Sequence, residues 1–448
     1  MFNEKDDYKS FMGLTPLILF VAMFLITGIV TNNFSSMPVL VGFMFVLAYS
    51  LSLNRKDKKI SLEEKVEIFA RSGGESTIIL MVTIFILAGA FYSVANAMGS
   101  VDATVNFGLS ILPSKAILPG IFVISCIISF AMGTSMGTIT AIVPIAIGMA
   151  QQTGLDLSLL MGTVVGGAMF GDNLSFVSDT TIAAARTQGI ELRDKFKMNA
   201  LIVLPAVIVT VIILSLVPEA TGTIAVGEYS LIKILPYISI IISALIGLNV
   251  MVVLAIGIGT GAILGLSLGA FNFIELLGFI QRGFGWMQDL CLIAIIIGGI
   301  IGLMNYYGGV NYLLDKITSK IKSKKGAEAG IATLAALIDV ATANNTISIV
   351  TAGPLSKNIS KQYSIDLRRT ASLLDIFSSA FQGLLPYGGQ LLVAAGLAQI
   401  SPMQIVPYNY YSFLMILFGG LSIVFNVPRL KGYQKETIIE QEVEKEVF

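Results

Sequence analysis

The sequence contains no histidine and only two cysteines in 448 residues, and these absences narrow its chemistry. Histidine is the commonest proton carrier near neutral pH and a common metal ligand. Any protonation chemistry must therefore use carboxyl groups or, less readily, lysine or tyrosine. The cysteines, Cys126 and Cys291, both lie in apolar runs. We interpret them as small core residues, which leaves neither a disulfide framework nor a cysteine–histidine metal set.

Charged residues are also scarce, at 12% of the chain, whereas an average soluble protein has about 25%. Hydrophobic residues make up 55%, and the mean hydropathy is +0.84. This balance predicts an all-α polytopic membrane protein. The net charge of zero gives no reason to expect nucleic acid or another polyanion as a partner. The polar N-terminus and the long first apolar run argue against a cleavable signal peptide.

Long apolar runs are plentiful, and we expect about 12–14 membrane segments if each crossing takes about 20 helical residues. The clear spans are residues 11–31, 37–53, 77–98, 116–132, 198–217, 231–248, 250–269, 287–307, 326–341 and 408–427. Residues 133–197 and 342–407 are apolar but interrupted by glycine, proline, asparagine, aspartate and serine. They could hold full spans, half-helices or re-entrant hairpins. We expect residues 431–448 to form a polar cytoplasmic tail.

The two halves of the chain resemble each other at a constant spacing. Asp156 and Asp366 are 210 positions apart, and so are Pro144 and Pro354 within similar apolar contexts. The recurring offset predicts a duplication, with residues 1–220 as the first membrane repeat and residues 221–430 as the second.

Basic residues indicate how the repeats are oriented. Residues 54–71 hold six Lys or Arg, whereas their counterpart, residues 271–286, holds one. The bias is reversed for residues 100–115, with one, and residues 310–325, with five. Because basic loops stay in the cytoplasm, equivalent loops should lie on opposite sides of the membrane and both termini in the cytoplasm. Inverted repeats with helices broken at the midplane are typical of secondary transporters, and we expect a plasma-membrane location.

The main candidate site is the sequence FGDNLSFVSDTTIAAARTQG, residues 170–189. Helix-breaking residues interrupt an apolar run there, and a new half-helix is predicted to begin at Ser178 and Asp179. Backbone carbonyls at such a break suit Na⁺, and side-chain oxygens add to them. The candidate ligands are Asp172, Asn173, Ser175, Ser178, Asp179 and Thr181, with Asp172 and Asp179 as the Na⁺ carboxylates. The alternative is that Asp179 only caps the half-helix and Asp172 pairs with Arg186 or a neighbouring helix.

Other breaks supply further candidates. Thr134 and Ser135 lie in a glycine-rich break, although small residues of this kind also serve helix–helix contacts. In the second half the candidates are Asp339, Asn344, Asn345, Asp375, Ser379 and Gln382. The spacing of the last three places them on one helix face. An ion pair with Arg368 or Arg369 is the alternative for Asp375.

No enzyme signature is present. The glycines of residues 256–261 lie within an apolar span and not after a strand, so they form no dinucleotide-binding fingerprint. A Walker A sequence is also missing, which argues against ATP as the energy source. We therefore expect a transporter that is no enzyme and needs no cofactor beyond Na⁺ as coupling ion.

The sequences GTSMGTITAIVPIA and FGDNLSFVSDTTIAAARTQG resemble the NhaC family of Na⁺/H⁺ antiporters. The resemblance implies Na⁺/H⁺ exchange by alternating access, within a wider group of inverted-repeat transporters. It carries over to Asp172, Ser175, Ser178, Asp179, Thr180 and Thr181 as site residues. Asn173 and Phe176 stand where the family often has a basic residue and a proline.

Two functions follow as alternatives. In the first, buried Asp172 holds either H⁺ or Na⁺, supported by Asp179 and Asp339, because burial favours the neutral form of a carboxyl group. In the second, the protein is a Na⁺-coupled transporter of a small amino acid or organic acid. The expected partners are Na⁺, H⁺, possible small carboxylates or amino acids, and the lipid bilayer, and a homodimer is compatible with the sequence.

Overall fold

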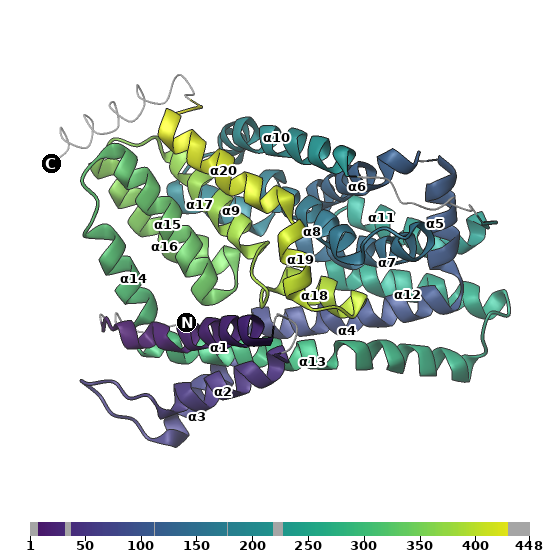
Figure 1. The fold of residues 1–448 in the computed structure, drawn as a ribbon, viewed down its shortest axis with the longest axis horizontal. Helices are drawn as coiled ribbons and strands as arrows, with labels where there is room; N and C mark the ends of the chain where they lie inside the picture. The colour runs from purple at the N-terminus through teal and green to yellow at the C-terminus, as the bar shows by residue number, and fades with distance from the viewer. Residues whose placement is uncertain (1–7, 32–36, 112, 177, 218–226, 429–448) are drawn as a thin grey trace.

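The computed structural model describes residues 8–31, 37–111, 113–176, 178–217 and 227–428, and every regular element among them is helical (Figure 1). The first half contains η1 (Phe11–Leu14), α1 (Thr15–Thr31), α2 (Val39–Ser52), α3 (Leu62–Gly73), α4 (Ser76–Ala97), α5 (Ser100–Ile111), η2 (Ser114–Ala116), α6 (Ile117–Met132), α7 (Ser135–Thr153), α8 (Leu157–Leu174), α9 (Asp179–Gln188) and α10 (Leu192–Leu216). The second half contains α11 (Leu231–Leu245), α12 (Val250–Ser267), α13 (Phe273–Tyr306), α14 (Gly309–Thr318), α15 (Lys324–Thr342), α16 (Asn345–Gln362), α17 (Leu367–Gln382), α18 (Gly389–Ala398), α19 (Pro402–Ile405), η3 (Val406–Tyr408) and α20 (Tyr410–Phe425).

The all-α membrane class predicted from composition is confirmed. Among the described residues, six helical stretches are long and apolar enough to cross a bilayer, or seven if the bent pair of α18 with α19 and η3 is one span. Four shorter apolar helices accompany them. Helices dominate because each backbone amide and carbonyl in hydrocarbon must find a partner within the protein. The expected tail, residues 431–448, lies outside the described residues.

Two helices begin earlier than their apolar runs predict. α13 starts at Phe273 because Asn272 and Glu275 form a capping box, so most of residues 271–286, expected to be a loop, is helical. α10 starts at Leu192, whereas its apolar run begins at residue 198, and it therefore includes Lys195 and Lys197. The second difference determines the geometry of the candidate site.

The elements repeat with the offset seen in the sequence. α7 and α16 begin 210 positions apart, at Ser135 and Asn345, and α9 and α18 begin 210 positions apart, at Asp179 and Gly389. Asp156 and Asp366 both cap the helix that follows through a side-chain oxygen. The same local chemistry therefore begins α8 and α17. The opposite orientation of the two copies stays a prediction.

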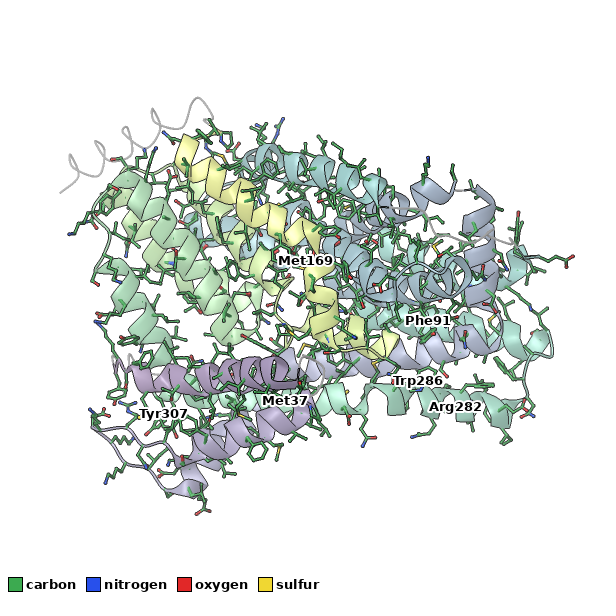
Figure 2. The ribbon with its side chains drawn as sticks, viewed as in Figure 1. Met37, Phe91, Met169, Arg282, Trp286 and Tyr307 are labelled. Atoms are coloured by element: carbon green, nitrogen blue, oxygen red, sulfur yellow. The ribbon has the colours of Figure 1, made fainter. Side chains whose placement is uncertain are left out.

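The two halves interlock. α11 of the second half packs on α5 and α6 of the first, whereas η1 of the first half packs on α13 and α14 of the second. In Figure 1 the purple α1 lies beside green helices, and the teal α11 and α12 lie among blue ones. The long helices α4 and α13 run together along the lower edge, where Arg282 and Trp286 are labelled in Figure 2. Met169 of α8 lies near the middle of the same view.

Candidate functional site

Four helix breaks bring polar groups into the apolar interior. α6 ends at Gly133 and α15 at Ala343, both with a left-handed backbone (φ of 66° and 48°), and the chain then turns into α7 and α16. Ser348 of α16 donates to the Ala335 carbonyl of α15, so α15 and α16 form an antiparallel hairpin. α6 and α7, which contact each other beyond their own break, form the second hairpin. The other two breaks separate α8 from α9 and α17 from α18. Each break frees backbone groups that only neighbouring side chains can satisfy.

Asp172, at the end of α8, lies at the point where both hairpins meet. Its side chain is only 3% exposed. Ser135 donates to it through its backbone amide (3.2 Å) and its hydroxyl (2.7 Å). Asn345, the counterpart of Ser135 in the second half, donates from Nδ2 at 3.2 Å. All three donors are neutral, so the carboxyl group is positioned by both halves without a cation bonded to it.

A chain of amides continues this arrangement, and we call the five residues Ser135, Asp172, Asn345, Gln382 and Gln390 the Asp172 cluster. Gln390 donates to the Ser135 hydroxyl at 3.1 Å, and Gln382 donates to the Gln390 side-chain oxygen at 2.7 Å. The Oε1 atom of Gln382 is buried and has no hydrogen-bond partner among the described residues. A carboxylate and an orphaned amide oxygen joined through one hydrogen-bonded chain are oxygen ligands of the kind that suits a small hard cation such as Na⁺.

A second cluster contains a residue that the sequence analysis did not select. Lys195 of α10 is fully buried and pairs with Asp375 of α17 at 2.9 Å. Its ammonium also donates to the Asn173 carbonyl and the Thr181 hydroxyl, both at 2.7 Å. Asn199 donates to the same Asp375 oxygen at 2.6 Å and to the Asn173 carbonyl at 2.8 Å. We call these five residues the Lys195 cluster.

The Lys195 cluster occupies the backbone carbonyls expected to receive Na⁺. The Asn173 carbonyl accepts from Lys195 and Asn199, and the Asp172 carbonyl accepts from Thr180 (2.6 Å) and Thr181 (3.3 Å). The ammonium group of Lys195 therefore lies at the end of α8. The side-chain oxygens of Asp172 are left for a mobile cation. The signal available in the sequence was the i, i+4 spacing of Lys195 and Asn199, which puts them on one face of α10.

The remaining candidates divide between these clusters and their rims. Asn173 donates to Asp375 at 3.3 Å and accepts from the Tyr411 hydroxyl at 2.8 Å, so it joins both halves. Ser175 and Ser178 are buried in the break between α8 and α9. Asp179 is exposed at the start of α9, where it accepts from Thr346 at 2.7 Å.

The helix breaks of the hairpins hold two more candidates. Thr134 is the N-cap of α7 and makes no side-chain capping bond, whereas Asn344 caps α16 by accepting from the Ile347 amide at 2.9 Å. Thr134 and Asn344 are only partly buried, next to the buried Ser135 and Asn345. They therefore border the Asp172 cluster and are not part of it.

Two candidates on the second hairpin and α17 have unpartnered side chains. Asp339 and Ser379 are fully buried, and neither Asp339 oxygen nor the Ser379 hydroxyl has a hydrogen-bond partner among the described residues. Asp339 lies one turn before the break between α15 and α16. It belongs to neither cluster.

The arginine partners considered for Asp172 and Asp375 are wrong, whereas Asp172 does bond to neighbouring helices, through Ser135 of α7 and Asn345 of α16. Arg368 pairs with Asp366 at 2.6 Å and Arg369 with Glu328 at 2.8 Å, so neither pairs with Asp375. Arg186 is exposed on α9, and the hydrogen bonds of Asp172 come from Ser135 and Asn345 instead.

Comparisons with known proteins identify the family of the chain. The model of the Na⁺/H⁺ antiporter family matches residues 8–217 and residues 213–427, one match in each half. The chain is 25% identical to the Na⁺/H⁺ antiporter NhaC of Alkalihalophilus pseudofirmus, over 76% of this chain and 82% of that protein. It is 22% identical to the malate-2H⁺/Na⁺-lactate antiporter of Bacillus subtilis, over 96% of this chain and 98% of that protein. Among solved structures, the YdaH transporter of Alcanivorax borkumensis aligns with a TM-score of 0.43 and 14% identity, covering 92% of this chain and 99% of that one.

Proposed function

This chain belongs to the Na⁺/H⁺ antiporter family, and on that premise we propose that it exchanges Na⁺ for H⁺ at Asp172 by alternating access. Membership of an antiporter family points to a transporter and not to an enzyme. The proposal assigns the step at which the two ions compete to one carboxyl group.

One observation carries the proposal: Asp172 is buried with neutral hydrogen-bond donors and no bonded cation. An isolated carboxylate in a protein interior is unstable unless it takes up a proton or a cation. The nearby ammonium of Lys195 is already engaged by Asp375, Thr181 and the Asn173 carbonyl. Asp172 therefore has two ways to become neutralised, H⁺ or Na⁺, and they exclude each other.

Na⁺ would find oxygen ligands in the Asp172 cluster. The Ser135 hydroxyl oxygen lies 2.7 Å from the carboxylate, and the orphaned Gln382 oxygen belongs to the same hydrogen-bonded chain. When H⁺ replaces Na⁺, the protonated carboxyl gains an O–H donor that these acceptors can receive. Because both hairpins hold Asp172, a movement that opens one side of the site alters the same ligand set.

Replacement of the carboxylate tests the proposal. In proteoliposomes containing the full chain, Asp172→Asn should reduce Na⁺-driven proton movement to the level of protein-free liposomes. Asp102→Asn is the matched control, because Asp102 is exposed on α5, and it should exchange at the wild-type rate. Wild-type exchange by a folded Asp172→Asn protein would eliminate Asp172 as the switching group.

A second function has its own support. The N-termini of α7, α9 and α18 have no side-chain caps, so their amides could bind an organic carboxylate. One relative is named a malate-2H⁺/Na⁺-lactate antiporter. The second candidate is therefore Na⁺-coupled transport of a small organic acid or amino acid. Stimulation of ²²Na⁺ flux by one member of a panel of such compounds would select it, and an unresponsive flux would favour simple ion exchange.

The proposal also covers the location of the protein, the side of its termini, its cofactors and its oligomeric state. We place it in the plasma membrane with both termini in the cytoplasm, because the lysines of residues 316–325 and the basic residues of 54–71 mark that side. No cofactor other than the coupling ion is needed for the proposed exchange. Homodimerisation is compatible with it, since each chain contains a complete Asp172 cluster.

A further inference from the structure

Asp339 is the one fully buried aspartate of the described residues for which neither carboxyl oxygen has a hydrogen-bond partner. Buried carboxylates elsewhere in the protein are accommodated differently: Asp172 accepts three hydrogen bonds and Asp375 pairs with Lys195. Buried polar groups without partners are rare because each costs about 1–3 kcal/mol, and charged ones cost more. The burial of Asp339 without a partner therefore needs an explanation in terms of what its oxygens bind.

The surroundings of Asp339 can be compared with those of its counterpart in the first half. Ser129 occupies the position of Asp339 in the first half, 210 residues earlier, and its hydroxyl donates to the Ala168 carbonyl on α8. In the second half, Glu328 of α15 pairs with Arg369 of α17, and Gln382 donates to the Ala343 carbonyl at 3.2 Å. These two contacts fix α15 and α17 side by side in the same direction. Asp339 consequently lies level with Ser378 and Ser379, as Ser129 lies level with Ala168.

In this position a carboxylate oxygen of Asp339 would face a backbone carbonyl oxygen of α17, and both atoms are hydrogen-bond acceptors. Where the first half has a hydroxyl that donates to a carbonyl, the second half has a carboxyl group, which can donate only when it is protonated. The charged and titratable groups nearby offer no compensation. Tyr387 donates its hydroxyl to the Val340 carbonyl at 2.7 Å, and Asp375 on α17 already holds Lys195. On α16, Asn345 and Ser348 carry no charge, and Ser348 already donates to the Ala335 carbonyl of α15.

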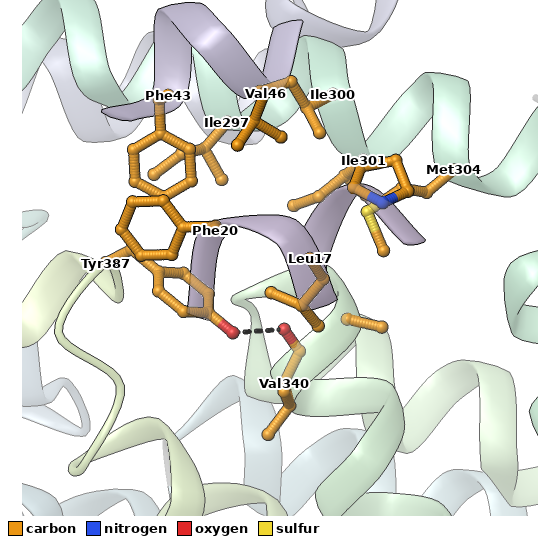
Figure 3. Close-up of a pocket in the computed structure, with 12 residues that line it drawn as sticks. Leu17, Phe20, Phe43, Val46, Ile297, Ile300, Ile301, Met304, Val340 and Tyr387 are labelled. Carbon is orange, nitrogen blue, oxygen red and sulfur yellow. Dashed lines mark hydrogen bonds between the residues drawn. The ribbon is translucent and has the colours of Figure 1, made fainter. Parts of the chain in front are cut away.

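A small cavity with mainly apolar walls lies next to the residues that follow Asp339. The following residues, Val340 and Ala341, line a cavity of about 20 Å³ between the last turn of α15 and helices α1, α2 and α13 (Figure 3). A cavity of that volume can hold about one water molecule. At the edge of this cavity the Tyr387 hydroxyl donates to the Val340 carbonyl (Figure 3). Movement of the α15–α16 hairpin away from α1 and α2 would open the space beside Val340, the residue that follows Asp339.

We propose that Asp339 is a second proton-binding site, separate from the Asp172 cluster, that holds a proton in this conformation and exchanges it with water once per transport cycle. The inference rests on the proposed Na⁺/H⁺ exchange and adds one proton to it. In each cycle the Asp339 carboxylic acid loses H⁺ to water on one side of the membrane, and the carboxylate accepts H⁺ from water on the other. Asp172 exchanges Na⁺ for H⁺ in the same cycle as proposed above, so each cycle moves two protons against one Na⁺.

The stoichiometry of exchange tests the inference. Asp339→Ser introduces the first-half residue, whose hydroxyl can donate to the facing carbonyl without titrating. In proteoliposomes with the membrane potential clamped at zero, we would measure the pH gradient that just balances an imposed Na⁺ gradient. Asp339→Ser should still exchange, and its balancing pH gradient should be double that of the wild type, because one proton balances each Na⁺ instead of two. An unchanged balancing gradient, or a change in the Na⁺ count, would overturn the inference.

Infrared spectroscopy provides a second readout that does not depend on transport. Asp172→Asn protein should keep a protonated-carboxyl C=O band, and the band should vanish when Asp339→Ser or Asp339→Asn is added. If no Asp339-dependent band exists, Asp339 is not protonated and the inference fails. The proposed function fails separately, if Asp172→Asn continues to exchange ions. The two results are therefore distinguishable in one set of variants.

Discussion

The buried pair of Lys195 and Asp375 makes the sharpest stability prediction. Both side chains are fully buried, and their charged atoms are 2.9 Å apart. Lys195→Met keeps much of the apolar stem but removes the ammonium, which leaves the Asp375 carboxylate with only two amide donors, from Asn173 and Asn199. Removing one partner of a buried pair costs about 3–5 kcal/mol, because the other charge stays buried without compensation. We expect Lys195→Met to lower the free energy of unfolding by that amount.

The double variant separates charge from packing. In Lys195→Met/Asp375→Leu no charge is left, and Asn199 still donates to the Asn173 carbonyl. The Asn173 side-chain amide loses its acceptor altogether, which costs about 1–3 kcal/mol, and the Asn199 amide keeps one of its two acceptors. The double variant should therefore be more stable than Lys195→Met alone by about 2 kcal/mol, and the two single effects should not add.

The measurement is unfolding in mixed micelles by SDS titration, followed by circular dichroism. Lys197→Met is the matched control, since Lys197 is 51% exposed and lies 3.7 Å from Asp194, a surface pair worth about 0–1 kcal/mol. The Lys195→Met deficit should shrink as the pH falls, because a proton can neutralise the abandoned Asp375. A deficit below about 1 kcal/mol, or strict additivity in the double variant, would refute the assignment of Lys195 as the counter-charge of Asp375.

Two further predictions concern the framework. Gly89→Ala should destabilise the fold by about 1–3 kcal/mol, because its new Cβ would overlap the Gly283 backbone where α4 and α13 approach each other, whereas Gly278→Ala on α13 meets open space and should be neutral in the same SDS titration. Asn409→Ala should lower stability by about 1–3 kcal/mol, because it orphans the buried Gly383 carbonyl that Asn409 reaches at 2.6 Å. Loss of Na⁺/H⁺ exchange without a change in stability would contradict this structural role for Asn409.

Much of the framework could be predicted from the sequence because it depends on local chemistry. Glycine and N-capping residues mark the helix breaks, and the break expected in residues 170–189 lies between Leu174 and Asp179. The convergence of Asp172 with Ser135 and Asn345 could be expected only in outline, from the positions of the breaks. The distances and the neutral donors depend on how the two hairpins pack, and no local pattern encodes that packing.

Lys195 shows why the rest could not be predicted. In a short basic segment, lysine normally indicates the cytoplasmic surface, and Arg193 and Lys197 on either side are indeed exposed. Its burial follows from the early start of α10 at Leu192, which turns residue 195 inward, and from Asp375, 180 positions away. The helix start depends on tertiary contacts, so neither fact could be obtained from the segment alone.

Framework residues are repeated between the two halves, whereas the buried acidic residues are not. Asn199 and Asn409 are equivalent and perform the same task, donating to the equivalent carbonyls of Asn173 and Gly383 in the two halves. Such matched positions maintain the fold.

The three fully buried or nearly buried aspartates are unmatched. Asp172 has Gln382 as its counterpart, Asp339 has Ser129, and Asp375 has Val165. A charge that loads an ion or a proton is needed only once, so it has no reason to be repeated in both copies. The unmatched acids are therefore the positions at which the two copies acquired different chemistry, and comparing the chain with itself identifies them without any relative. Introducing the missing acid as Gln382→Glu should place a second carboxyl group in the Asp172 cluster, and the Na⁺ dependence of exchange should change. The same substitution at an exposed glutamine, Gln281→Glu, should leave it unaltered.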